Sequence, residues 1–299
     1  MLLPSAPYRP AHERERLHRE AARRWRRLGD AYPELAETIA FGRGLVALYI
    51  DDLPAPVALD MTVERARQKL ADGLPLLADE DFDVDTTGLR HFFFRLCSWA
   101  SRQPALAAGG LRLERALLDA ELRVEELFDA ALAGDDATLD AVAARLDVPA
   151  PLVRTLVGYA VVAALLSMAR PLASLLTAAN HRWERSDCPV CGGPPLLAEL
   201  VGERTDRWLR CAVCGTGWHY PTDRCIHCGT TETEQRETLS VGDQRMPNRL
   251  EVCRHCRGYL KLATVPAPTP SELLTIVDTA FVALDEAARE QGFQPAPVG

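Results

Sequence analysis

The sequence predicts an all-α helical domain, followed by small β-containing metal modules and a C-terminal helix. Two observations support this multidomain class. Eight of the nine cysteines lie between Cys188 and Cys256, in four Cys-x-x-Cys pairs. The residues before them contain one cysteine, Cys97, and place apolar residues at the three-to-four spacing of helices. With 299 residues, 47% of them hydrophobic, the chain can bury a core and divide into several domains.

The change in cysteine content gives the expected domain boundaries. The helical domain is predicted at residues 1–184, the first metal module at 185–223 and the second at 224–265. Residues 266–299 begin with the proline-rich sequence PAPTP, and we expect them to form a linker and a C-terminal helix.

Helical periodicity runs through the N-terminal domain. An arginine-rich helix is predicted at 12–32 and further helices at 111–135 and 136–148. One or two core helices are expected at 148–180, with Pro171 at the break. Alternating patterns typical of strands are missing from this half of the sequence, which favours an all-α bundle. Cys97, next to aromatic residues, is expected to be a small core residue.

Hydropathy and charge indicate where the protein is located and which kinds of partner it can bind. The longest uncharged stretch, 155–169, is shorter than the roughly 20 residues of a membrane span, so we expect a buried helix and no membrane span. The first 16 residues become charged before a signal peptide could form, which predicts a cytoplasmic protein. The net charge of −8 argues against binding to nucleic acid, and residues 184–261 contain eleven basic and eleven acidic side chains.

The four Cys-x-x-Cys pairs have the spacing of metal-binding knuckles, in which a tight turn directs two thiolates at one ion. Two pairs complete a tetrahedral shell of four sulfurs, which suits zinc or iron. A glycine follows three of the pairs and suits the left-handed backbone that closes such a turn, whereas Arg257 intervenes before Gly258 in the fourth. The candidate ligands form two shells without remainder: Cys188, Cys191, Cys211, Cys214, Cys225, Cys228, Cys253 and Cys256.

Three pairings of these knuckles are possible from the sequence: neighbouring, alternating or nested. Neighbouring pairs leave loops of 19 residues between Cys191 and Cys211 and of 24 between Cys228 and Cys253. The first loop has the length typical of zinc ribbons and the second is slightly long, so spacing favours neighbouring pairs. Residues 215–224 would then connect two modules, with Trp218 as a packing residue between the two metal sites.

Several functions are compatible with this pattern. The simplest function of the sites is structural. Two bound ions would supply folding free energy to a module of about 80 residues with few large apolar side chains. A thiol–disulfide oxidoreductase would instead need a metal-free pair with a lowered thiol pKa, and a zinc-ribbon nucleic-acid binder would need a basic surface. Catalytic triads, phosphate loops and paired carboxylates are not evident, so we expect no catalytic residues and no enzyme activity. His227 and His255 are expected to be spectators or to lie just outside the ligand shells. His219 is expected to be a surface histidine in a turn, with contact to a partner as the alternative.

The C-terminal residues predict one more amphipathic helix. Thr269, Pro270 and Glu272 form a plausible cap at its start. Its apolar face needs a partner, and we expect it to pack on the helical domain or on another subunit. That face consists of Leu273, Val277, Phe281 and Leu284.

Three motifs together resemble the formate dehydrogenase accessory protein family FdhE. They are DCPVCGGPP at 187–195, LRCAVCGTGWHYPTDRCIHCG at 209–229 and CRHCRGYLKL at 253–262. One Cys-x-x-Cys pair is generic, but four pairs with the Trp218 context and the GYLK ending are much more specific. The resemblance covers most of the chain, weakly in the N-terminal half and specifically across 187–262.

The resemblance implies an all-α domain followed by two rubredoxin-like modules, each holding one metal ion, with iron in at least some members. It implies neighbouring pairing, so that Cys188, Cys191, Cys211 and Cys214 hold one ion and the remaining four knuckle cysteines the other. It also implies a cytoplasmic accessory factor that is needed to form active formate dehydrogenase and acts on the catalytic subunit of that enzyme.

Overall fold

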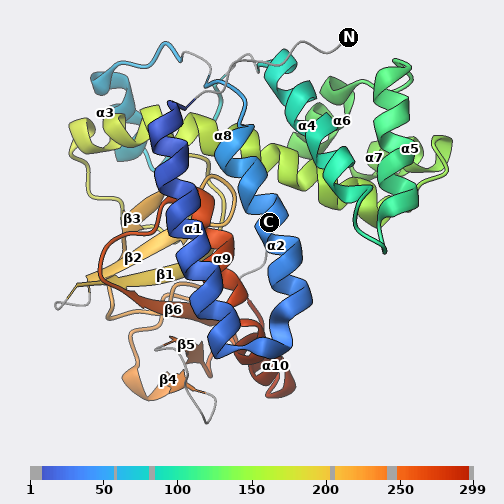
Figure 1. The fold of residues 1–299 in the computed structure, drawn as a ribbon. Helices are drawn as coiled ribbons and strands as arrows, with labels where there is room; N and C mark the ends of the chain where they lie inside the picture. Colours follow the sequence, from blue (N-terminus) through green and yellow to red (C-terminus); the bar gives the residue numbers. More distant parts are fainter. Residues whose placement is uncertain (1–8, 57–58, 81–84, 203–205, 241–247, 296–299) are drawn as a thin grey trace. The chain divides into compact units, whose positions relative to one another are not determined.

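The structure is a computed structural model that describes residues 9–56, 59–80, 85–202, 206–240 and 248–295. The first eight residues, on which the expectation of no signal peptide partly rests, lie outside these ranges. The chain divides into two compact units (Figure 1). One contains Met1–Arg19, Ala40–Leu59 and Phe82–Met168, and the other contains Glu20–Ile39, Asp60–Asp81 and Ala169–Gly299. The four-part division at 184, 223 and 265 stays a prediction about independent folding.

The first unit is helical, as the apolar periodicity predicts. Its core gathers leucine, valine, alanine and aromatic side chains around Phe92, Phe93 and Cys97, each at most 1% exposed. The helices that lie wholly or partly in this unit are α1 (Ala11–Ala31), α2 (Ala36–Asp51), α4 (Thr86–Ala100), α5 (Ala107–Leu118), α6 (Val124–Leu132), α7 (Asp136–Arg145) and α8 (Ala150–Ala179).

The helix predicted at 111–135 is wrong as a single element, because the structure divides it into α5 and α6. The chain leaves α5 through Ala120, which has a left-handed φ of 57°, and the Leu122 amide donates back to the Ala116 carbonyl. This turn places Leu122 in the core with no exposed surface. Burial of that leucine outweighs the cost of a left-handed alanine, which is about 1–2 kcal/mol.

α8 continues through Pro171 without a break. The expected break at Pro171 is therefore wrong, although a proline inside a helix removes one backbone hydrogen bond. Among the described residues α8 is long and apolar enough to cross a membrane, with a mean hydropathy of 1.9 over its most apolar window. That window is 67% buried within the protein, which is typical of a core helix of a soluble fold.

The second unit is built on a six-stranded sheet in the order β3-β2-β1-β6-β5-β4. Helix α3 (Val63–Ala71), the end of α1 and three 3-10 turns, η1 (Pro33–Leu35), η2 (Thr233–Gln235) and η3 (Ser271–Leu273), belong to the same unit. The strands are β1 (Pro195–Val201), β2 (Asp206–Cys211), β3 (Gly217–His219), β4 (Arg236–Leu239), β5 (Asn248–Cys253) and β6 (Tyr259–Val265).

The two predicted metal modules are the two halves of this one sheet. Within each half the strands pair antiparallel, as ribbon hairpins do. The halves join where β1 runs parallel to β6, with Ala198 opposite Leu262 and Val201 opposite Val265. The alternating sequences predicted the hairpins, but a parallel pair between strands about 60 residues apart carries no local signal.

The C-terminal residues form two short helices, α9 (Leu274–Thr279) and α10 (Val282–Glu290), rather than one. The expectation that their apolar face packs on the helical domain or another subunit is wrong. Phe281, Leu284 and Ala288 pack instead on the sheet, against Leu250 and Tyr259 among others. The partner of this face is thus the half of the sheet that carries the last two cysteine pairs.

Candidate metal centres

All four Cys-x-x-Cys turns have the same backbone geometry. In each, the amide of the first cysteine donates at 2.9 Å to the carbonyl of the residue five positions later. The four donor–acceptor pairs are Cys188–Gly193, Cys211–Thr216, Cys225–Thr230 and Cys253–Gly258. A closed ring of this kind fixes where both sulfurs of the pair point.

The fourth residue after each first cysteine has a left-handed backbone. The φ values are 76° at Gly192, 68° at Gly215, 73° at Gly229 and 62° at Arg257. The fourth turn is therefore not interrupted by Arg257, since arginine occupies the position that glycine fills in the other three. Its guanidinium donates to the carbonyls of Gln291 and Gly292 and stacks 4.2 Å from the Phe293 ring, contacts that help to hold the strained backbone.

The first four-sulfur group joins the first and second cysteine pairs. The sulfurs of Cys188 and Cys214 lie 3.6 Å apart and those of Cys191 and Cys211 lie 3.5 Å apart. All four ligand atoms are within 4.8 Å of one another. Three of these cysteines are buried and Cys191 is half-buried.

The second group joins the third and fourth pairs and is more open. The sulfurs of Cys225 and Cys256 are 3.8 Å apart, as are those of Cys228 and Cys253. Cys228 is exposed and Cys256 is half-buried, while the other two are buried. Neighbouring pairs thus converge in both halves of the sheet, and their role as metal ligands stays a prediction.

Both groups fit a tetrahedral ion. A metal–sulfur distance of about 2.3 Å requires sulfurs about 3.8 Å apart, close to the four separations above. Backbone amides also point at the sulfurs: Val190 donates to Cys188 at 3.4 Å and His227 to Cys225 at 3.4 Å. Such donors stabilise thiolates, so the residues present suit a divalent or trivalent cation.

Burial and hydrogen bonding shift the pKa values of three thiols in the first group. Burial raises the pKa of the Cys188 and Cys214 thiols well above the usual range of cysteine. Hydrogen bonds from the neighbouring thiols lower the pKa of Cys211, so this sulfur ionises first. A metal ion that binds there must therefore displace the protons of Cys188 and Cys214.

Segments outside the cysteine motifs hold the first group. The amides of Leu76 and Leu77 donate to the carbonyls of Pro189 and Val190 at 2.9 and 2.8 Å, which pairs the 75–77 segment with the first turn. The indole of Trp183 donates to the Asp187 carbonyl at 2.8 Å. The sequence alone did not reveal the 75–77 segment, which lies more than 100 residues before the cysteine that it covers.

We expected Trp218 to pack between the two metal sites, but in the structure Trp218 and Arg207 make separate contacts. The Trp218 indole, on the edge strand β3, donates to the Arg185 carbonyl at 3.1 Å, so it secures the approach to the first turn. The two halves, which pair through β1 and β6, are also linked by Arg207 of β2, which is 1% exposed. Its guanidinium donates to the carbonyls of Pro221 and Arg224 in the connector and forms an ion pair with Glu251 of β5 at 3.1 Å.

The other candidates from the sequence lie outside both groups. His227 makes a 3.0 Å hydrogen bond with the Tyr259 carbonyl, and burial lowers its pKa. His219 packs edge-on against Trp208, with ring centroids 5.6 Å apart. Cys97 is fully buried in the helical unit, where burial raises its pKa.

Together the fold and the two sulfur groups define a class of protein. It has a helical unit and one sheet made of two ribbon-like halves, each with a candidate metal centre. Residues 187–222 match the family model described as FdhE, central domain. A protein FdhE homolog from Aquifex aeolicus is 30% identical over 117 residues, which cover 38% of this chain and 41% of the relative. A protein FdhE homolog from Shewanella baltica is 32% identical over 112 residues, 37% of this chain and 36% of the relative.

Among solved structures, the FdhE protein from Pseudomonas aeruginosa has a similar fold, with a TM-score of 0.60 and 25% sequence identity. The superposition covers 97% of this chain and 95% of that one. The matched segments span less than half the length of the two curated relatives. The resemblance to the FdhE family that the cysteine motifs predicted is confirmed, and it extends in fold to the helical part of the chain.

Proposed function

We propose that this protein is a cytoplasmic accessory factor required to form active formate dehydrogenase, and that it binds the catalytic subunit of that enzyme. The observation that carries the proposal is the FdhE central-domain match, in a chain whose fold is similar to an FdhE protein along nearly its whole length. We further propose that each four-cysteine group holds one ion of iron or zinc.

The chemistry of the site favours a binding protein over an enzyme. Eight sulfurs gathered in two closed groups leave no cysteine pair free to form and break a disulfide, which disfavours the thiol–disulfide oxidoreductase alternative. The near balance of charge across the sheet disfavours the nucleic-acid alternative. A bound iron would supply one-electron chemistry without a change of ligands, and a bound zinc would supply rigidity.

The roles of the protein's own residues follow from this proposal. The knuckle amides hold the negative charge of the thiolates, and the ion pair between Arg207 and Glu251 fixes one half of the sheet against the other. The client would then meet a preformed surface, which lowers the entropic cost of association.

The test is co-purification of the full chain with a tagged catalytic subunit of formate dehydrogenase, under anaerobic and aerobic conditions. We expect recovery of a complex, and loss of it when Cys211→Ser disrupts the first group. Cys97→Ser, which changes a cysteine outside both groups, is the matched control and should keep the complex. Failure to recover a complex in either condition would refute the proposed function, and elemental analysis of the same sample distinguishes iron from zinc.

A further inference from the structure

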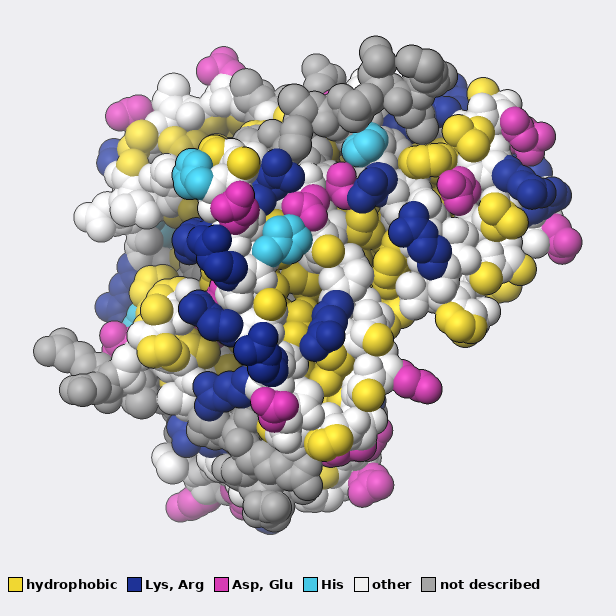
Figure 2. Space-filling view, viewed as in Figure 1, with side chains coloured by type: hydrophobic (Ala, Val, Ile, Leu, Met, Phe, Trp, Pro, Cys, Tyr) yellow, Lys and Arg dark blue, Asp and Glu magenta, His cyan; other side chains and the backbone are white. Residues whose placement is uncertain are grey.

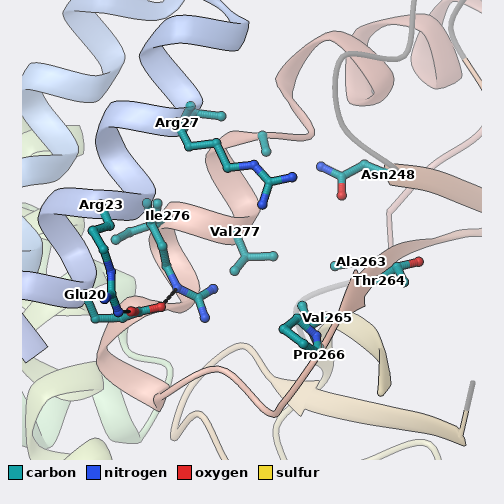
Figure 3. Close-up of a pocket in the computed structure, with 13 residues that line it drawn as sticks. Glu20, Arg23, Arg27, Asn248, Ala263, Thr264, Val265, Pro266, Ile276 and Val277 are labelled. Carbon is teal, nitrogen blue, oxygen red and sulfur yellow. Dashed lines mark hydrogen bonds and ion pairs between the residues drawn. The ribbon is translucent and has the colours of Figure 1, made fainter. Parts of the chain in front are cut away.

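A pocket outside both cysteine groups lies between the end of α1, helix α9 and the end of β6 (Figure 3). Its volume is about 330 Å³, within the range of about 300–1,000 Å³ that ligand pockets occupy. Apolar side chains form much of its lining, among them Ala263, Val265, Ile276 and Val277. Every residue of the pocket belongs to the second unit.

One wall of the pocket is basic. Arg23, Arg24 and Arg27 come from successive turns of α1, and Figure 2 shows Lys and Arg side chains gathered over this helix. Arg24 donates to Glu20 at 2.7 Å and to the Thr269 hydroxyl at 3.1 Å, and Arg23 also pairs with Glu20. Arg27 has no hydrogen bond or ion pair with any described residue, so its charge is available to a ligand.

The opposite side holds an unpaired donor. Asn248, at the start of β5, is 6% exposed, and its side-chain nitrogen has no hydrogen-bond partner among the described residues. In Figure 3 the Asn248 amide and the Arg27 guanidinium point toward each other across the pocket. A buried donor without a partner costs about 1–3 kcal/mol, and a ligand that accepts a hydrogen bond there would remove this cost.

These groups define the chemistry of the ligand. The free polar groups are donors, whereas the one carboxylate among the described lining residues, Glu20, is already bound by two arginines whose hydrogen bonds lower its pKa. The ligand must therefore accept hydrogen bonds and carry negative charge, and it must have an apolar part for the lining. The guanidinium fork can bind either a carboxylate or a phosphate, but the Glu20 charge would repel a phosphate dianion more strongly than a carboxylate, so a carboxylate fits better.

We propose that this pocket binds a peptide segment in which an aspartate or glutamate stands beside an apolar residue. Charge complementarity at the pocket supports a peptide: Arg23 and Arg27 line it and are exposed, so an extended acidic chain can reach both. The carboxylate would lie between Arg27 and Asn248, with the apolar side chain over Val277 and Ile276. This inference does not depend on which protein is the client, and its test contains no client.

The test is fluorescence anisotropy of the full chain with a fluorescein-labelled, amidated nonapeptide of alternating leucine and aspartate. We expect a dissociation constant on the order of 10 μM. Arg27→Gln should weaken binding about fivefold, because its guanidinium makes a charge-assisted hydrogen bond to the carboxylate. Arg23→Gln with Arg27→Gln should weaken binding at least about tenfold, because the wall then also loses the positive charge of the exposed Arg23. Peptides with asparagine for aspartate, or serine for leucine, should each bind at least about tenfold more weakly.

Arg26→Gln is the matched control, because Arg26 is an exposed arginine of the same helix that does not line the pocket. It changes the net charge equally and should leave the affinity within about twofold. Equal losses in Arg26→Gln and Arg27→Gln, equal affinity for the asparagine peptide, or no binding at all would each overturn the proposal. Displacement of the peptide by inorganic phosphate at concentrations below those of unlabelled peptide would also overturn it, by reassigning the pocket to phosphate.

Discussion

The two four-cysteine groups have the same turns and different surroundings. The first has three buried cysteines, lies against the 75–77 segment and is flanked by Trp183 and Trp218. The second leaves Cys228 exposed, and its fourth turn is held by the C-terminal residues through Arg257 and the Gln294 amide. Local sequence thus builds the sulfur shell, while remote segments decide how much water reaches it.

This difference predicts unequal metal chemistry in two sites of equal ligand number. Metal–thiolate bonds in a buried shell are protected from competing ligands and oxidants, whereas an exposed thiolate can be attacked directly. We therefore expect the first group to serve mainly in folding and the second to exchange ions and electrons more readily.

The largest expected effect is the loss of a whole site. Cys211→Ser should remove the first ion and lower the free energy of unfolding by more than about 4 kcal/mol, because β2 ends at Cys211 and pairs with β1, which joins the two halves of the sheet through β6. Cys228→Ser should remove the second ion at a smaller cost. Metal content and denaturant unfolding measure both, and Cys97→Ser should retain two ions per chain.

Double variants make the pairing itself testable by stoichiometry. Cys188→Ser with Cys211→Ser changes one group and should leave one ion per chain. Cys211→Ser with Cys225→Ser changes both groups and should leave none. The reverse pattern would contradict the neighbouring arrangement of the cysteines.

The next effect concerns equivalent glycines in the two groups. A Cβ at Gly193 would lie 2.8 Å from the Val213 side chain and 3.3 Å from the sulfurs of Cys191 and Cys211, so Gly193→Ala should disturb the ligands directly. We expect a loss of about 1–3 kcal/mol in stability and weaker binding of the first ion, measured by competition with a chelator.

At the second group, a Cβ on Gly258 would lie 2.5 Å from the His227 ring rather than from a sulfur. Gly258→Ala should therefore reduce stability with less effect on metal affinity. Gly158→Ala is the control, since nothing lies within 4 Å of a Cβ there, and it should stabilise helix α8 by up to about 1 kcal/mol. Equal loss of metal affinity in the Gly193 and Gly258 variants would mean that the different surroundings of the two cysteine groups do not affect how tightly they bind metal.

Rates of metal release test the exposure difference directly. Excess 4-(2-pyridylazo)resorcinol should remove the two ions in two phases, the second-group ion about tenfold faster, which corresponds to about 1.4 kcal/mol in the barrier. Cys228→Ser should lack the fast phase. A single phase in the unmodified protein would refute unequal access.

A smaller effect concerns the segment that covers the first group. Glu80, 8% exposed, pairs with Lys69 at 2.6 Å and with Arg65, and the Lys69 hydrogen bond lowers its pKa below the usual 4.5. A lowered carboxyl pKa adds stability above the unfolded pKa that is lost as pH falls through the folded pKa. Glu80→Gln should therefore cost about 1 kcal/mol at pH 7, and the difference should shrink as pH falls below 4.5 and through the lowered pKa of the folded state. Thermal unfolding at several pH values measures it, and a constant difference would contradict the assigned charge state.

The smallest expected effect is at Arg257. Arg257→Ala keeps a left-handed non-glycine residue and loses the bonds to Gln291 and Gly292, whereas Arg257→Gly relieves the backbone. The glycine variant should be more stable than the alanine variant by about 1 kcal/mol in denaturant unfolding. Equal stability would mean that this turn carries no backbone strain.

Regular local patterns made much of the fold predictable. The helix expected at 12–32 is α1 at Ala11–Ala31, and the four cysteine turns form where their spacing placed them. The misses all needed long-range information. Leu122 is buried in the core, and the turn that places it there interrupts a predicted helix. Phe281 packs on the sheet rather than on the helical domain.

The sequence by itself determined the helical first part, the eight cysteines and the closed backbone turn around each pair. These depend on residues at most five positions apart, within reach of helical periodicity and turn geometry. Only the tertiary structure decided that both halves share one sheet through β1 and β6, and that Arg207 joins them. It also decided that the 75–77 segment covers one site while the other stays open. Such contacts join segments tens to more than a hundred residues apart, and burial rather than local propensity selects them.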